Sequence, residues 1–114
     1  NIYKIMYEKA QPFYDKLVEM GYTVNVACLE KITKSLASIL GNADAAYVAA
    51  TDEAEMATVQ KNFVEAKLGA GSDKAEEVVA AVGEKMKGQN KKSRVVFYYL
   101  CCDELGCCAG YANA

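Results

Sequence analysis

Apolar residues recur at intervals of three and four along most of the chain, which predicts a series of helices that each bury one face. The first segment spans residues 2–20, where Pro12 is expected either to kink the helix or to break it. The second spans residues 26–40 and follows Asn25, a residue type that caps helix N-termini well. Each segment is followed by a glycine, which is expected to end it.

Three further helices are predicted in the middle of the chain. They are an alanine-rich turn at residues 43–50 capped by Asn42, a helix that begins at Thr51 and Asp52, and a helix that is capped by Ser72 or Asp73. The residues expected to face the core are Met56, Val59, Phe63 and Ala66 in the second of these and Ala75, Val79, Val82 and Met86 in the third.

The longest apolar run lies near the end of the chain, from Arg94 to Leu105, and reads RVVFYYLCCDEL. Residues 95–100 of this run are strong strand formers, but a strand needs a partner for its backbone groups, and the chain has no second run of this kind. Gly106 stands where a helix takes its terminal glycine. We therefore predict an all-α fold, with five or six short helices packed around a buried C-terminal helix at about residues 93–105. The tail after it is expected to pack little except Tyr111.

The composition narrows the possible functions. At 114 residues the chain is expected to form a single helical domain over residues 1–114, and its net charge of −2 favours no nucleic-acid partner. The absence of histidine removes the commonest general base and a common metal ligand. No apolar run approaches the ~20 residues needed to span a bilayer. We expect a protein that is not an enzyme, with no cofactor and no catalytic, cofactor-binding or metal-binding residues.

The chain begins with Asn1 rather than methionine, which indicates either a removed targeting segment or an incomplete chain. The expected location is the cytoplasm, or the interior of an organelle after removal of a targeting segment.

Cysteine is the most conspicuous chemical feature. Cys101, Cys102, Cys107 and Cys108 form a CC-x4-CC pattern, and Cys28 lies far from them in sequence. A four-thiolate metal site needs its sulfurs within ~2.3 Å of one ion, whereas adjacent helix residues point about 100° apart. Three interpretations stay open: a metal or iron–sulfur site, a vicinal or loop disulfide such as Cys102 with Cys107, and reduced cysteines that serve as small buried apolar residues.

Two groups of charged residues were candidates for binding or catalysis. The basic patch is either a phosphate or RNA contact or a solvated helix end in which Arg94 pairs with a carboxylate, and the net charge favours the second interpretation. Its members, followed in sequence by Tyr98 and Tyr99, are Lys85, Lys87, Lys91, Lys92 and Arg94. The acidic residues at one helix start are expected to cap it and to complement its dipole, and those near the chain end are expected to be exposed. They are Asp52, Glu53 and Glu55, and Asp103 and Glu104, respectively.

Two stretches resemble a family of small all-helical bacterial proteins that is catalogued only as a domain of unknown function. They are NADAAYVAATDEAEMATVQKNFVEAKLG at residues 42–69 and QNKKSRVVFYYL at residues 89–100. The resemblance implies a compact helical domain and supplies no activity, cofactor or substrate. The chain departs from the family pattern where it reads CCDELGCC instead of aliphatic and basic residues, and where it lacks a Gly-Pro before the first stretch. The matched positions are Asn42, Asp44, Val48, Asp52, Glu55, Val59, Asn62, Phe63, Lys67, Leu68, Gly69, Asn90, Arg94, Phe97, Tyr98 and Tyr99.

These observations lead to two hypotheses about function. The first is a protein-interaction module or accessory subunit of a larger complex, with a protein partner and no chemistry of its own. The second is a thiol-based redox or metal-binding protein that uses the C-terminal cysteines. Because polar groups near a core must be paired, we also predict that Arg94 binds a carboxylate or carbonyls of residues 42–52, and that the shared polar positions hold the fold.

Overall fold

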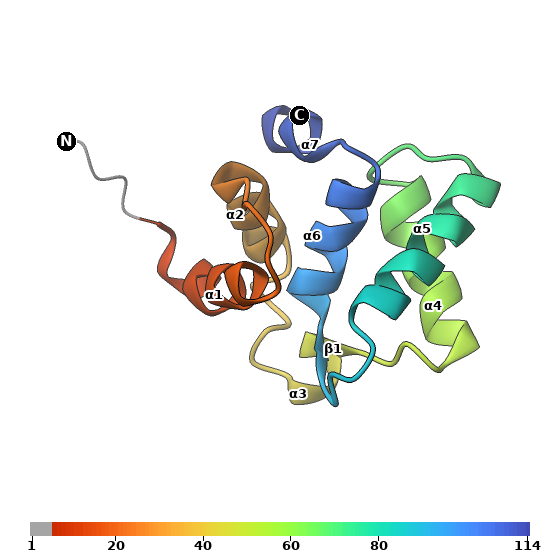
Figure 1. Cartoon of the computed structure of the whole chain (residues 1–114), viewed down its shortest axis with the longest axis horizontal. Helices are drawn as coiled ribbons and strands as arrows, with labels where there is room; N and C mark the ends of the chain where they lie inside the picture. Colours follow the sequence, from red (N-terminus) through yellow and green to blue (C-terminus); the bar gives the residue numbers. More distant parts are fainter. Residues whose placement is uncertain (1–5) are drawn as a thin grey trace.

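The structure is a computed structural model that describes residues 6–114, so the expectation for residues 2–5 lies outside the described part (Figure 1). The chain is mostly helical within this range, as predicted. In chain order the elements are η1 (Glu8–Ala10), α1 (Gln11–Glu19), α2 (Val26–Ser35), α3 (Ala43–Ala46), β1 (Tyr47–Val48), α4 (Glu53–Val59), η2 (Gln60–Glu65), α5 (Ser72–Lys85), β2 (Lys92–Ser93), α6 (Arg94–Glu104) and α7 (Cys108–Asn113).

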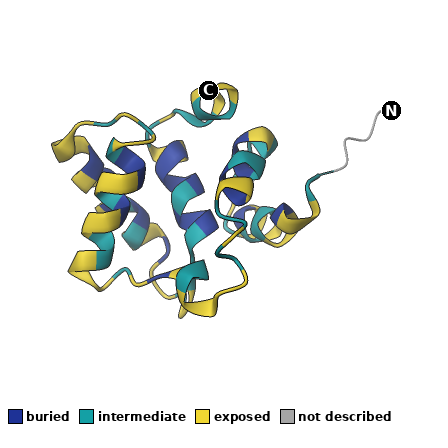
Figure 2. Cartoon of the chain, turned by 180° about the vertical axis from the view of Figure 1, so that it is seen from behind, coloured by how far each residue is buried: buried dark blue, intermediate teal, exposed yellow. Residues whose placement is uncertain are grey.

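Helix α6 is the buried centre of the fold. It runs between α2 and α5, with α1 and α7 also against it (Figure 1). Figure 2 shows it as the most deeply buried helix in the middle of the molecule. The prediction of a central helix at about residues 93–105 is confirmed, with Ser93 as its N-cap and Leu105 as its C-cap. Its buried residues are Val95, Val96, Phe97, Tyr99, Leu100, Cys101 and Cys102.

The predicted alanine-rich helix at residues 43–50 is only partly correct. Asn42 caps it by accepting hydrogen bonds from the N–H groups of Asp44 and Ala45, but α3 ends at Ala46. Tyr47 and Val48 are extended and pair antiparallel with β2, with Tyr47 opposite Ser93. This short ladder satisfies backbone groups on both sides and anchors the connector that leads into α6. A two-residue strand with its partner far along the chain leaves no periodic signal, so the pattern of alanines predicted helix instead.

Helix α2 ends at Ser35 rather than continuing to residue 40. The Asn25 cap is confirmed, because its side chain accepts a hydrogen bond from the N–H of Cys28 at 3.0 Å. Near the other end, the hydroxyl of Ser35 donates to the carbonyl of Ile32, a bond that competes with helical bonding. Leu36 then leaves helical geometry at φ −103° and ψ 3°. The apolar residues after Ser35, such as Leu36 and Leu40, lie in turns and still pack against the core.

Of the two outcomes expected at Pro12, a kinked helix or a broken one, the structure shows a break. A short 3₁₀ turn, η1, precedes α1, and Pro12 lies in the first turn of α1. Helix N–H groups have no intrahelical acceptor there, so proline costs no hydrogen bond. Gly21, at φ 93°, follows the end of α1 as expected.

The predicted core-facing stripe of α4 is correct at Val59 and Phe63 and wrong at Ala66, which is exposed. The helix changes to π geometry in η2, where the N–H of Ala66 donates to the carbonyl of Lys61, five residues earlier. This wider turn shifts the later residues around the axis. Val64 therefore takes the core position that the regular spacing had given to Ala66.

Helix α5 begins one residue earlier than predicted. Gly71 precedes it in extended geometry without a side-chain cap, so neither Ser72 nor Asp73 caps it. Its predicted core residues are all buried, together with Val78.

The prediction that the tail packs little is wrong. Residues 108–113 form α7, which packs against α2 and α6. The ammonium group of Lys31 on α2 donates to the carbonyl of Tyr111 at 2.7 Å and lies 4.3 Å from the centre of its ring. The tail is therefore tied down by a cation from α2.

Candidate functional site

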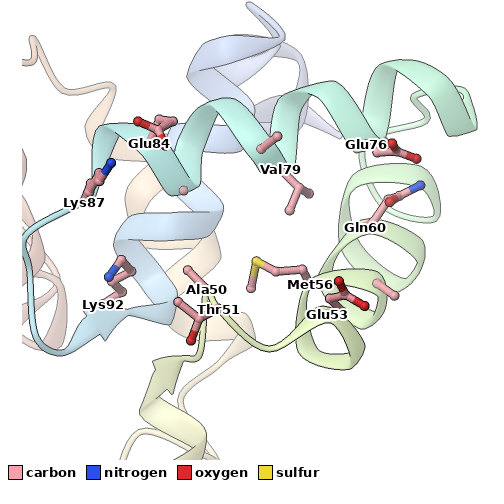
Figure 3. A pocket seen from close by; sticks show the side chains of 13 residues that line it. Ala50, Thr51, Glu53, Met56, Gln60, Glu76, Val79, Glu84, Lys87 and Lys92 are labelled. Carbon is pink, nitrogen blue, oxygen red and sulfur yellow. The ribbon is translucent and has the colours of Figure 1, made fainter.

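A groove of about 660 Å³ lies between α4 and α5. Helix α5 packs closely along η2 but contacts α4 less, so the two helices separate toward the start of α4. Figure 3 shows Met56 reaching from α4 into this space and Val79 pointing into it from α5. The remaining floor consists of small residues, including Ala57, Ala80 and Gly83. The arrangement leaves a channel with an apolar floor that is open to solvent between α4 and α5.

The two ends of the groove carry opposite charge. Lys87 and Lys92 lie at one end together with Glu84, and Glu53 and Glu76 lie at the other (Figure 3). No ion pair within residues 6–114 involves any of these five residues. Lys92 is partly engaged, because its ammonium donates to the carbonyl of Gln89 at 2.9 Å. The groove therefore presents charges that the fold itself leaves mostly uncompensated.

Gly83 is a glycine in the interior of an α-helix, a position where glycine costs roughly 0.5–1 kcal/mol relative to alanine. Its φ is not positive, and a Cβ built on it would meet no atom within 4 Å. Neither backbone geometry nor internal packing requires a glycine here. Gly83 lines the groove, so the missing side chain widens the channel at this point.

Arg94 lies in a satisfied polar cluster outside the groove. Its Nε donates to the carbonyl of Ala45 at 2.7 Å, and its Nη2 donates to Glu55 Oε1 at 2.7 Å and to the carbonyl of Tyr47 at 3.3 Å. Its Nη1 donates to the hydroxyl of Tyr98 at 3.3 Å. The prediction that Arg94 binds carbonyls of residues 42–52 is confirmed, and its carboxylate partner comes from just beyond that segment.

The acidic residues at the start of α4 have three different roles. Asp52 caps the helix as predicted, accepting hydrogen bonds from the N–H groups of Ala54 and Glu55. The side chain of Glu55 binds Arg94 instead of completing a capping box. Glu53 lies at the rim of the groove, a position that the sequence pattern did not indicate.

The basic patch predicted from the sequence is dispersed. Lys85 pairs with Glu104 at 2.6 Å, Lys91 lies 5.4 Å from the centre of the Tyr47 ring, and Arg94 is held by the cluster described above. Lys87 and Lys92 line the groove. The interpretation in which Arg94 pairs with a carboxylate is confirmed. Asp103 and Glu104 are exposed as expected, although Glu104 also pairs with Lys85.

All five cysteines are free thiols. Cys28, Cys101 and Cys102 are buried, whereas Cys107 and Cys108 are half-buried. The end of α6 explains why two of them meet. Gly106 at φ 67° lets the N–H of Cys107 donate to the carbonyl of Cys102 at 2.9 Å, the bond that defines a Schellman motif. This motif places Cys107 next to Cys102, whose thiol lowers the pKa of Cys107 against the larger effect of burial, which raises it.

The thiols form a chain across the interface of α2, α6 and α7. A hydrogen bond with Cys102, together with burial, raises the pKa of Cys28 to about 12. A hydrogen bond with Cys28, followed by burial, raises the pKa of Cys108, and burial raises the pKa values of Cys101 and Cys107. Thiols with raised pKa values stay protonated at neutral pH and are weak nucleophiles and weak metal ligands. Within residues 6–114 no group of three or more Cys, Asp or Glu side chains is arranged to hold a metal ion.

The groove is the feature that sequence reasoning missed. Met56, Val79 and Ala80 fit an ordinary helical pattern, and the separation of α4 from α5 arises only in the folded chain. One signal was present, because Gly83 interrupts a helix without ending it. A glycine of this kind often has a packing or functional reason.

These features define a small helical protein with a buried central helix and an open groove between two covering helices. The chain belongs to the family described as Protein of unknown function (DUF2853), whose model matches residues 14–108. The matched region includes α6 and both helices of the groove. A search of curated proteins found no match. No helix within residues 6–114 is long and apolar enough to cross a membrane.

Proposed function

We propose that this chain is a non-enzymatic interaction module that binds an amphipathic helix of a partner protein in the groove between α4 and α5, as an accessory subunit of a larger complex. The observation that carries the proposal is the open groove with an apolar floor, with two lysines and Glu84 at one end and two glutamates at the other, none of them in an ion pair within residues 6–114. Binding a helix by its apolar face in such a groove is a common mode of recognition.

The shape of the groove suits a helix. From Glu76 to Glu84 the groove follows α5 for about 12 Å at a rise of 1.5 Å per residue. A partner segment of about three turns fills this length and reaches the lysines beyond it. Small residues on the floor allow a close approach of the partner backbone, and the flexible side chain of Met56 adapts to its apolar residues.

The charges define the partner further. Basic side chains at one end of the partner helix lie beside Glu53 and Glu76, and acidic side chains at its other end lie beside Lys87 and Lys92. Charges of this kind at the edge of an interface chiefly set specificity and the rate of association. The partner is therefore a helix with an apolar stripe and opposite charges at its ends.

The test compares matched variants of the full chain purified gently from its source. Gly83→Leu fills the groove, whereas Gly83→Ala leaves it open and strengthens α5. Glu76→Lys reverses the acidic end, whereas Glu77→Lys changes the neighbouring exposed residue, which lies outside the groove and pairs only weakly with Lys74.

Native mass spectrometry measures the assembly. We expect the bound partner to be lost with Gly83→Leu, weakened with Glu76→Lys, and retained with both controls. Equal assembly in all four variants would overturn the proposal.

A second candidate function is thiol-based redox chemistry of Cys102 and Cys107, which the Schellman contact between them favours. Exchange with a small disulfide would form the Cys102–Cys107 bond and release two small thiols, so that the protein is oxidised and the reagent reduced. The raised pKa of Cys107 slows this exchange. Treatment with oxidised glutathione followed by mass analysis tests it. A loss of two hydrogens confined to this pair supports the redox candidate, and five intact thiols remove it.

A further inference from the structure

A second cavity, of about 490 Å³, lies where α2, η2, α6 and α7 meet. Its floor is aromatic. The rings of Phe63 and Tyr98 are stacked at 4.1 Å between centres and 18° between planes, and Tyr111 meets Phe63 edge-on at 6.0 Å. The volume falls in the range typical of small-molecule sites. These features are independent of the groove between α4 and α5.

The rim of this cavity carries two lysines, in a protein with a net charge of −2. Lys31 and Lys67 line it together with the backbone oxygen of Ala114, and no aspartate or glutamate among residues 6–114 does. Lys31 is fixed in place by the carbonyls of Tyr111 and Ala114, at 2.7 and 3.1 Å, and lies over the Tyr111 ring. Because an ammonium group has three donor hydrogens, one donor of Lys31 is left for a ligand.

Two further polar groups at the rim are available. Within residues 6–114 the side chains of Lys67 and Asn62 make no hydrogen bond or ion pair. Both belong to the segment around the π turn of η2, which sets the positions of Asn62 and Phe63 on the helix surface. The result is a cavity lined by three aromatic rings, with two cations and an amide donor at its rim.

We propose that this cavity binds a small organic anion, a carboxylate or phosphate carried on a flat apolar body. The apolar body lies against the aromatic floor of Phe63, Tyr98 and Tyr111. The anionic group receives charge-assisted hydrogen bonds from Lys31 and Lys67, which are roughly twice as strong as neutral ones. The side chain of Asn62 donates a further hydrogen bond.

The experiment is an NMR titration of the full chain with four probes. Phenyl phosphate and benzoate carry the two anions on the same ring, inorganic phosphate lacks the ring, and benzyl alcohol lacks the charge. We expect shift changes at Asn62, Phe63 and Tyr111 with the first two probes and much weaker binding of the last two. The relative affinities of phenyl phosphate and benzoate show which anion the site prefers.

A pair of variants ties the binding to this cavity. Lys67→Glu reverses a rim charge at an exposed residue whose side chain makes no hydrogen bond or ion pair within residues 6–114, so we expect the fold to be retained. Lys61→Glu makes the same change at an exposed residue of η2 outside the cavity, and it is the control. Loss of one charge-assisted bond predicts that Lys67→Glu weakens binding of the preferred probe by roughly tenfold or more, and that the control changes it little.

Two results would overturn the inference: no shift changes around the cavity with either aromatic anion at millimolar concentration, or equal weakening by the two variants. Neither result bears on the groove. The variants at Gly83 and Glu76 leave this cavity unchanged, so the two proposals fail independently.

Discussion

Glu53 and Glu55 lie two residues apart in the first turn of α4, yet they belong to two different surroundings. Glu55 accepts a hydrogen bond from Arg94 in a cluster that also ties α3 and β1 to α6. Glu53 stands at the rim of the groove without an ion pair within residues 6–114. The cluster uses its polar groups to hold the fold, whereas the groove holds charges that the fold does not use. Charged side chains without an ion pair beside an apolar surface therefore indicate a binding site better than charged side chains that are already paired within the fold.

The largest expected effect comes from breaking the cluster at its centre. Arg94→Met keeps much of the apolar stem but removes hydrogen bonds to Ala45, Tyr47, Tyr98 and Glu55. We expect a loss of about 2–4 kcal/mol in the free energy of unfolding, because charged partners left unpaired in a half-buried site are costly. Urea denaturation measures it. Lys91→Met, at an exposed residue, is the control, and similar losses for both variants would contradict a structural role for Arg94.

The buried thiols make the stability of the fold depend on pH. The pKa of Cys28 is raised from 9.0 to about 12 in the folded chain, so the folded state holds its proton more tightly than the unfolded state. The stability that results is fully present below pH 9.0 and is lost as the pH rises toward 12.

The expected loss is about 2 kcal/mol by about pH 11. Denaturation at a series of pH values measures the loss for the natural chain. The variant Cys28→Ala removes the titrating thiol, so its stability should fall less over the same interval. A pH profile unchanged by Cys28→Ala would show that other groups carry the alkaline loss.

A third prediction separates the two glutamates directly. Glu55→Gln weakens the charge-assisted bond to Arg94 and should cost about 1 kcal/mol. Glu53→Gln removes a charge that makes no ion pair within residues 6–114 and should change stability by less than about 0.5 kcal/mol. Thermal denaturation of the two variants in the same buffer makes the comparison. Equal destabilisation would erase the distinction drawn between the cluster and the groove rim.

The parts of the fold that could be predicted from the sequence are those set by local signals. Asn25 and Asp52 cap the helices that they were expected to cap, and Gly106 ends the central helix. The partners of Arg94 followed from the need to pair a charge near the core. Burial on all sides identified α6 as the centre despite its strand-forming residues. Each of these inferences depends either on residues that lie close together in sequence or on a single physical requirement, such as the pairing of a charge near the core.

The larger errors came from contacts between distant residues. The ladder of Tyr47 with Ser93 exists because α6 fixes one strand beside the other. The π turn that replaces Ala66 with Val64 in the core depends on how η2 packs on α5, and regular spacing does not contain that information. The groove has the same origin, since its walls come from two helices whose separation is a tertiary property. Gly83 was the one local sequence feature that pointed to the groove.

The smallest expected effect concerns that glycine and has the opposite sign. Gly83→Ala adds a methyl group that meets no atom within 4 Å and removes the entropic cost of glycine in α5. We expect the free energy of unfolding to rise by roughly 0.5–1 kcal/mol. Urea denaturation of the isolated chain measures the gain, and Ala80→Gly, on the same helix and in the same groove, should lose a similar amount. If Gly83→Ala instead destabilises the isolated chain, the glycine serves the fold itself, and its use as a marker of the groove fails.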